Sequence, residues 1–200
     1  MSTSAQEDAN ALVMAASGAQ TLVSTVAGVP AVAFQAFDRR LAISAAWAPT
    51  SGTLTMTGIW LPQNFTVNAI TFMSGAQAEA TGTHLFFAIY RADTLALLAQ
   101  ATDNTGAAAF GASLSFRMAL TAPIQMPYTG LYYLGFVCVA SGNVPTLLNL
   151  TSGVTTNLGA VASTAPILAA TSTSGISSGS APNPAGALTT ITQCLWAGVD

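Results

Sequence analysis

The chain has one histidine, His84, and few other side chains that could do chemistry. Metal sites are built from clustered Cys, His and carboxylate ligands. No Cys, Asp or Glu lies within a few residues of His84. The sequence therefore predicts no acid, base or metal constellation around His84 and no cofactor.

Residues 175–179, G-I-S-S-G, match the G-x-S-x-G pattern of a nucleophile elbow. That elbow needs a strand before it, a helix after it, and an acid followed by a histidine later in the chain. His84 comes earlier, Asp200 is the only acid that follows, and the surrounding tract is rich in Ser and Gly. We interpret the match as chance.

The carboxylates stand in no catalytic pattern either. Glycoside hydrolysis needs a pair of acids in defined roles, whereas Glu79, Asp93 and Asp103 are typical of solvated loops. Residues 103–106, D-N-T-G, lack the later acidic ligands of a calcium loop and favour a turn. The chain has no lysine, which excludes the usual phosphate-binding loop. These observations predict a protein that is not an enzyme.

Cys138 and Cys194 both lie in apolar, strand-like runs. A disulfide between the two runs is one alternative, but two cysteines do not make a disulfide framework. The interpretation that the composition favours is a pair of buried free thiols that behave as small hydrophobic side chains.

Six aromatic side chains are candidates for stacking on sugar rings in a lectin-like groove. In strands, aromatic residues more often form the core or subunit contacts, because they dominate buried energetics. An open groove with exposed tryptophans would favour glycan binding, and buried tryptophans would favour a structural role. The six are Trp47, Trp60, Tyr90, Tyr132, Tyr133 and Trp196.

Charge is scarce in this chain of 200 residues. Hydrophobic residues make up 52% and charged residues 6%, with a net charge of −3, against about 25% charged residues in ordinary soluble domains. High hydrophobicity excludes intrinsic disorder, and four arginines without lysine exclude an electrostatic nucleic-acid binder. Residues 41–78 and 118–199 carry no charge at all. Either partners cover this surface, or it is a Ser/Thr-rich β surface of an extracellular particle.

Residues 1–39 are predicted to form an N-terminal arm. Ser4 and Glu7 fit a capping box, which predicts a helix over about 5–16 that is too short to be stable alone. Residues 9–37 are uncharged and long enough to cross a bilayer. Gln20, Pro30 and many small residues argue against insertion, so we expect no membrane span.

Residues 40–200 are predicted to form an all-β domain, a jelly-roll-like β-sandwich of about eight strands. Residues 146–187 form a long Ser/Thr/Gly/Ala-rich excursion, and 95–101 could instead be helical. The expected core includes Trp60, Ile70, Phe87, Ile89, Leu134 and Phe136. The expected strands are 41–47, 54–61, 65–73, 85–92, 95–101, 114–121, 130–140 and 188–196.

Five runs within residues 50–145 form a recurring β pattern. They are LTMTGIWLP (54–62), FTVNAITF (65–72), HLFFAIY (84–90), LALLAQ (95–100) with Asp103, and GLYYLG (130–135). This pattern resembles a β-sandwich module of virion proteins from tailed phages that infect actinobacteria, where it occurs in minor tail proteins, fibres and head-surface proteins. The resemblance implies a virion component rather than a chemistry, and it does not choose the location on the particle.

From the resemblance and the composition we expect a non-enzymatic subunit on the surface of a phage particle, either a capsid decoration or a minor tail protein. Its partners would be itself, as a homotrimer, and other virion proteins. The alternative is a carbohydrate-binding module that recognises host-surface glycans. Deleting residues 1–37 should leave the sandwich folded but impair assembly. The arm residues expected to carry the contact are Leu12, Val13, Leu22, Val23 and Val26.

Overall fold

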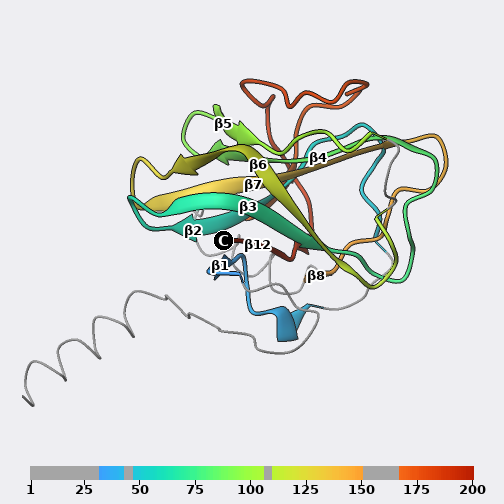
Figure 1. The fold of residues 1–200 in the computed structure, drawn as a ribbon, viewed down its shortest axis with the longest axis horizontal. Coiled ribbons are helices and arrows are strands. Elements are labelled where there is room, and N and C mark those ends of the chain that lie inside the picture. The colour runs from blue at the N-terminus through green and yellow to red at the C-terminus, as the bar shows by residue number, and fades with distance from the viewer. Residues whose placement is uncertain (1–31, 43–46, 106–109, 151–166) are drawn as a thin grey trace, which may run out of the picture.

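The computed structural model describes residues 32–42, 47–105, 110–150 and 167–200. These residues form an all-β sandwich of antiparallel sheets (Figure 1), which confirms the predicted fold class. The helix expected over residues 5–16 and most of the arm lie outside the described residues.

The larger sheet has six strands in the order β10-β9-β2-β7-β4-β5. Its long central strand β7 is rich in aromatic and β-branched residues, which fit a pleated surface buried on both faces, and it lies between β2 and β4. The strands are β2 (Thr55–Leu61), β4 (Gly82–Arg91), β5 (Leu97–Gln100), β7 (Gly130–Ala140), β9 (Ala169–Thr171) and β10 (Thr189–Thr190).

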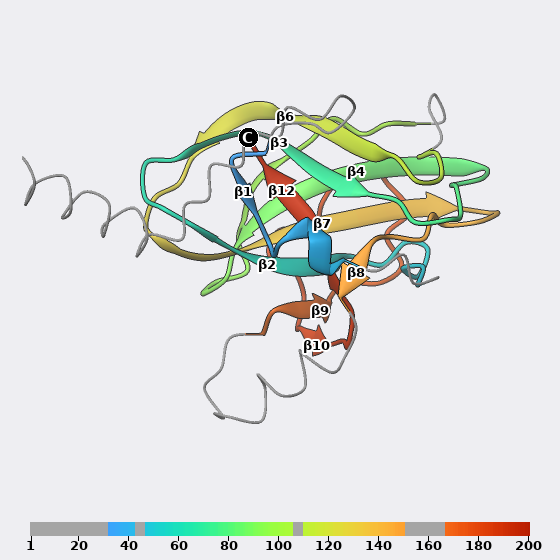
Figure 2. The same ribbon diagram turned by 90° about the horizontal axis from the view of Figure 1, so that it is seen from below.

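The second sheet has four strands in the order β1-β12-β3-β6. These are β1 (Phe34–Gln35), β12 (Ala197–Val199), β3 (Thr66–Met73) and β6 (Ser115–Gln125). The two ends of the described chain therefore pair with each other, because β1 lies antiparallel to β12 at the edge of this sheet (Figure 2). Residues 33–36, which belong to the expected arm, hydrogen-bond to β12 through Ala33 and Ala36.

Two smaller features complete the fold. A two-stranded ladder joins β8 (Asn149–Leu150) to β11 (Cys194–Leu195), and a short 3-10 helix, η1 (Arg39–Leu41), follows β1. On one side of the sandwich, a bridge between Ala101, which follows β5, and Leu120 of β6 links the two sheets. Beside it, the hydroxyl of Thr121 donates to the carbonyl of Gln100 at 2.9 Å.

The main core fills the space between the sheets. Phe72 contacts Phe87 edge-on at 4.8 Å and Phe136 at 5.5 Å between ring centroids, and such pairs add about 0.5–1.5 kcal/mol beyond their burial. Five of the six expected core residues are fully buried, namely Ile70, Phe87, Ile89, Leu134 and Phe136. The sixth prediction was wrong, because Trp60 is 62% exposed.

Trp60 is exposed because the outer face of the six-stranded sheet is covered along only part of its length. A second apolar cluster lies on that face and includes Leu54, Met56 and Phe86. Residues 167–190, hereafter the cover segment, pack on it through Ala185, with Ile176, Ala181 and Leu188 around it. The side chain of Trp60 lies on the same face of β2 as those of Leu54 and Met56, since alternate residues share a face, but it lies beyond the residues that β9 pairs with.

Two predicted strands differ from the structure. No strand forms at Ala42 or Trp47, and residues 43–46 lie outside the described residues. Asp38 instead caps η1 by accepting a hydrogen bond from the backbone N–H of Arg40 at 2.9 Å. The apolar run 188–196 is not one strand, because it pairs in turn with β9 and β8 before β12 pairs with β3. The strand predicted at 95–101 is confirmed, because these residues contain β5 and not the alternative helix. With these short pieces, the described residues contain twelve strands.

Candidate functional site

His84 has an acidic partner that the sequence did not reveal. Its Nδ1 donates to Oδ2 of Asp103 at 2.7 Å, and Oδ1 of the same carboxylate accepts the backbone N–H of Leu85 at 3.0 Å. Both side chains are largely buried. Asp103 is therefore not the solvated loop residue that we expected. One carboxylate on one histidine does not make a catalytic constellation, and none of the described residues form a group of three potential metal ligands.

The G-x-S-x-G segment ends against this pair. A β-carbon on Gly179 would lie 2.1 Å from Oδ2 of Asp103, so the backbone of residue 179 passes directly over the carboxylate. Gln100 binds the same segment from β5, donating to the carbonyl of Gly179 at 3.2 Å and accepting from the N–H of Ala181 at 2.8 Å. The segment lies in the cover segment rather than between a strand and a helix, and its geometry is that of an anchored loop.

The cover segment is held by polar contacts at its centre. The hydroxyl of Tyr90 donates to the carbonyl of Pro182 at 3.2 Å, and Oδ1 of Asn183 accepts from the N–H of Leu97 at 3.1 Å. The N–H of Ala185 donates to the carbonyl of Leu95 at 2.9 Å. Residues 167–187 of the expected excursion therefore have a structural role, because they keep the outer apolar cluster out of water.

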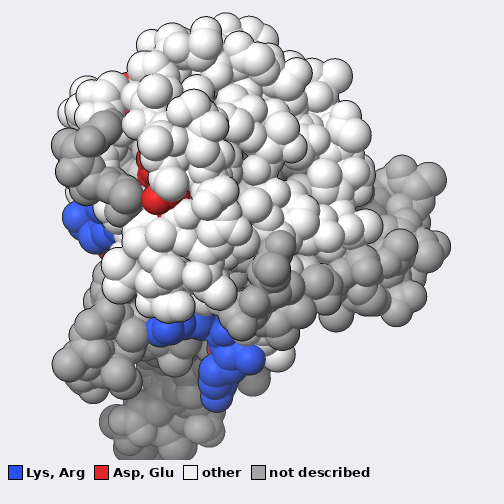
Figure 3. Space-filling view, turned by 90° about the vertical axis from the view of Figure 1, so that its right-hand side faces the viewer, with Lys and Arg blue, Asp and Glu red and all other residues white. Residues whose placement is uncertain are grey.

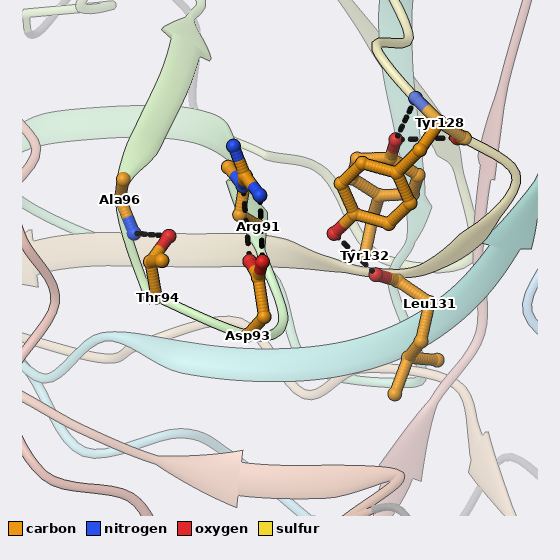
Figure 4. A network of polar contacts seen from close by, with 7 residues as sticks. All are labelled: Arg91, Asp93, Thr94, Ala96, Tyr128, Leu131 and Tyr132. Atoms are coloured by element: carbon orange, nitrogen blue, oxygen red, sulfur yellow. Dashed lines mark hydrogen bonds and ion pairs between the residues drawn. The ribbon is translucent and has the colours of Figure 1, made fainter. Parts of the chain in front are cut away.

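A polar and aromatic cluster lies where the β4–β5 and β6–β7 turns meet (Figure 4). The rings of Tyr128 and Tyr132 stack with centroids 4.9 Å apart, and the guanidinium of Arg91 lies 5.2 Å from the Tyr128 centroid. Asp93 binds Arg91 at 2.6 Å, and this hydrogen bond lowers the pKa of the Asp93 carboxyl. Burial raises the pKa of Tyr132, whose hydroxyl donates to the carbonyl of Tyr128 at 2.7 Å. The arrangement closes the turns and leaves no free acid or base.

Of the six aromatic candidates, only Trp60 is exposed. Tyr90, Tyr132, Tyr133 and Trp196 are buried, and Trp47 is half-buried against the core. Trp60 pairs with Leu131 across β2 and β7. The adjacent β2–β3 turn is polar, and Gln63 within it donates through its side-chain amide to the carbonyl of Pro127 at 3.1 Å.

Both cysteines are buried free thiols, which confirms that interpretation. Burial raises the pKa of the Cys138 thiol to about 12, with a further contribution from the charge of Glu79. Burial also raises the pKa of Cys194, although a hydrogen bond with Thr57 opposes the shift. Both thiols stay protonated and unreactive at neutral pH.

The charged residues of the described chain are few and almost all paired. Figure 3 shows a face made mostly of uncharged residues, with the arginine atoms at its edge. The expected contact residues Leu12, Val13, Leu22, Val23 and Val26 lie outside the described residues, so their role stays a prediction. Within the described residues, no helix is long and apolar enough to cross a membrane.

A scan of the chain against protein-family models finds no matching family, and a search of the curated proteins finds no matching relative.

Proposed function

We propose that this protein is a non-enzymatic structural subunit on the surface of a phage particle, a capsid decoration or minor tail protein that assembles as a homotrimer. The observation that carries the proposal is the uncharged stretch 118–199, which runs from β6 through the C-terminal strand β12. A free soluble protein normally keeps charges of both signs over its surface. A surface without them is suited to contact with neighbouring subunits.

Two further observations support this role. Leu41, Trp60 and Leu114 are each more than half exposed, and exposed large apolar side chains become favourable contacts when a neighbour removes them from water. The resemblance of residues 50–145 to sandwich modules of virion proteins is the reason for proposing a phage particle as the assembly. Closed rotational symmetry is the usual way in which identical chains bury such surfaces.

Antibodies raised against the folded protein test the proposal on purified particles of the phage that encodes it. We expect the antibodies to label intact particles in electron micrographs, and mass spectrometry to find the protein at many copies per particle. A protein present in infected-cell lysate but missing from purified particles would contradict the proposal.

A second candidate function is recognition of host-surface glycans, and the exposure of Trp60 favours it. An exposed aromatic ring on a rigid strand can stack on the apolar face of a sugar ring. The neighbouring turn 62–64 supplies amide side chains for hydroxyl groups. Titration with oligosaccharides from the host envelope should then change the tryptophan fluorescence of the wild type but not of Trp60→Ala. Leu114→Ala, a distant exposed position, should bind as the wild type does.

A further inference from the structure

We infer that the N-terminal arm of one copy docks on the turn Arg39–Leu41 of a second copy, with the carboxylates of Glu7 and Asp8 facing the guanidinium of Arg39. The inference rests on the proposed self-assembly and names the surface that receives the arm. It follows from the charges of the chain, from an exposed apolar side chain beside Arg39, and from the place where the arm joins the sandwich.

Arg39 is the one arginine with no carboxylate partner among the residues that the structure describes. The other three are bound by Asp38, Asp93 and Asp200, in the pairs Arg40–Asp38, Arg91–Asp93 and Arg117–Asp200. All four arginines lie within the described residues, and the chain has no lysine. An unpaired cation stands out in a chain with so few charges.

The acids of the described residues, unlike Arg39, all have partners. Asp103 binds His84, and the carboxylate of Glu79 accepts the backbone N–H of Phe110 at 3.2 Å. With three further aspartates paired to arginines, every acid in the described residues has a partner. The remaining acids of the sequence are Glu7 and Asp8, adjacent in the arm. Glu7 and Asp8 are therefore the acids that remain to pair with the unpaired positive charge of the sandwich.

The turn also offers an apolar contact. Leu41 is 56% exposed and directly follows the two arginines. The arm is apolar beyond its acidic pair, with Leu12 and Val13 shortly after Asp8. An acidic pair followed by apolar residues matches a surface that presents a cation and then a leucine. The exposed ion pair alone would contribute little, so the apolar contact must supply affinity while the charges set the register.

The choice of a second copy as the source of the arm follows from the proposed self-assembly. The described chain begins at residue 32, directly before the two-residue strand β1, and Arg39 lies just beyond the other end of β1. The turn that receives the arm therefore lies close to the point where the arm leaves the sandwich.

A charge-exchange experiment on the full chain tests the inference. Variant one is Arg39→Glu, and variant two combines Glu7→Arg with Asp8→Arg. Each alone should associate roughly tenfold more weakly than the wild type, because like charges then meet at the contact. Mixed in equal amounts, the variants should recover part of the association, because two of the three contacts in a mixed trimer then join opposite charges. Arg39→Lys is the matched control and should associate as the wild type does.

Sedimentation velocity at low and high salt is the measurement. Association in the mixture that exceeds that of each variant alone, by a margin that shrinks at high salt, supports the inference, because salt screens the charges but not the apolar contact. Two variants that stay weak when mixed would show that the arm acids and Arg39 do not meet between copies, which overturns the inference but leaves self-assembly intact. Variants that associate as tightly as the wild type would also overturn it. A monomeric wild type would overturn the proposed assembly itself, and the inference with it. Unchanged thermal unfolding of each variant shows that the fold is retained.

Discussion

The indole Nε1 of Trp196 donates a hydrogen bond to Oε1 of Gln35 at 3.2 Å. This bond joins residues at opposite ends of the chain and makes β1 part of the sandwich. Phe34 supports the same contact, because its ring meets that of Phe65 edge-on at 4.7 Å. The sandwich therefore includes residues that the sequence had assigned to the arm.

Two truncations separate the arm from β1. Removing residues 1–31 should weaken self-association and leave the free energy of unfolding of the dissociated monomer unchanged. Removing residues 1–37 should lower the free energy of unfolding by about 2–4 kcal/mol, because it also removes a partly buried phenylalanine and the β1 hydrogen bonds. Urea denaturation of both proteins is the check. Equal stabilities would show that β1 contributes nothing to the fold.

Gly179→Ala should destabilise the cover segment. The new β-carbon would meet the Asp103 carboxylate at 2.1 Å, and that carboxylate is held by His84 and Leu85 and cannot easily move. Steric overpacking of this kind costs about 1–3 kcal/mol. Ser178→Ala, a change at an exposed neighbour, should stay within about 0.5 kcal/mol of the wild type. Thermal unfolding measures both, and a wild-type melting temperature for Gly179→Ala would contradict the packing described.

Stability should fall in alkaline solution. The pKa of Cys138 is about 12 in the folded protein, against 9.0 for an ordinary thiol. Between these pH values the unfolded chain has lost the proton while the folded chain keeps it, so raising the pH favours unfolding. Burial raises the pKa of Tyr90, Tyr133 and Cys194 as well, which acts in the same direction.

The variant Cys138→Ala isolates the contribution of this thiol to the pH dependence of stability. Between about pH 9 and 12 the free energy of unfolding of this variant should fall less steeply with pH than that of the wild type. The two slopes should differ by up to about 1.4 kcal/mol per pH unit. Urea denaturation across this range is the measurement. An identical slope in the wild type and the variant would show that Cys138 does not titrate with unfolding.

A strand was predictable from the sequence where a segment keeps the same neighbouring strands along its whole length. Residues 130–140 were predicted to form a strand, and β7 has those bounds, because its aromatic and β-branched residues suit a central strand. Run 188–196 was predicted as one strand and is not, because hydrophobicity does not show that a segment changes partners along its length.

The candidate site was harder to predict. Trp60 was predicted to lie in the core, and this was wrong. The alternation of residues along a strand shows which side chains share a face of the sheet, but it does not show how much of that face other segments cover. The partner of His84 was missed because Asp103 lies 19 positions away and reaches it through the β4–β5 hairpin. Its turn-like sequence gave no sign of the pairing. The free charge on Arg39 could be found only after the other arginines had been assigned partners in three dimensions.

Self-association is the central claim, and the mass of the full-length protein in solution tests it most directly. Sedimentation equilibrium at micromolar concentration should give three times the chain mass, and removal of residues 1–31 should shift the population toward monomer without loss of β structure. A full-length protein that sediments as a stable monomer at these concentrations would contradict the account.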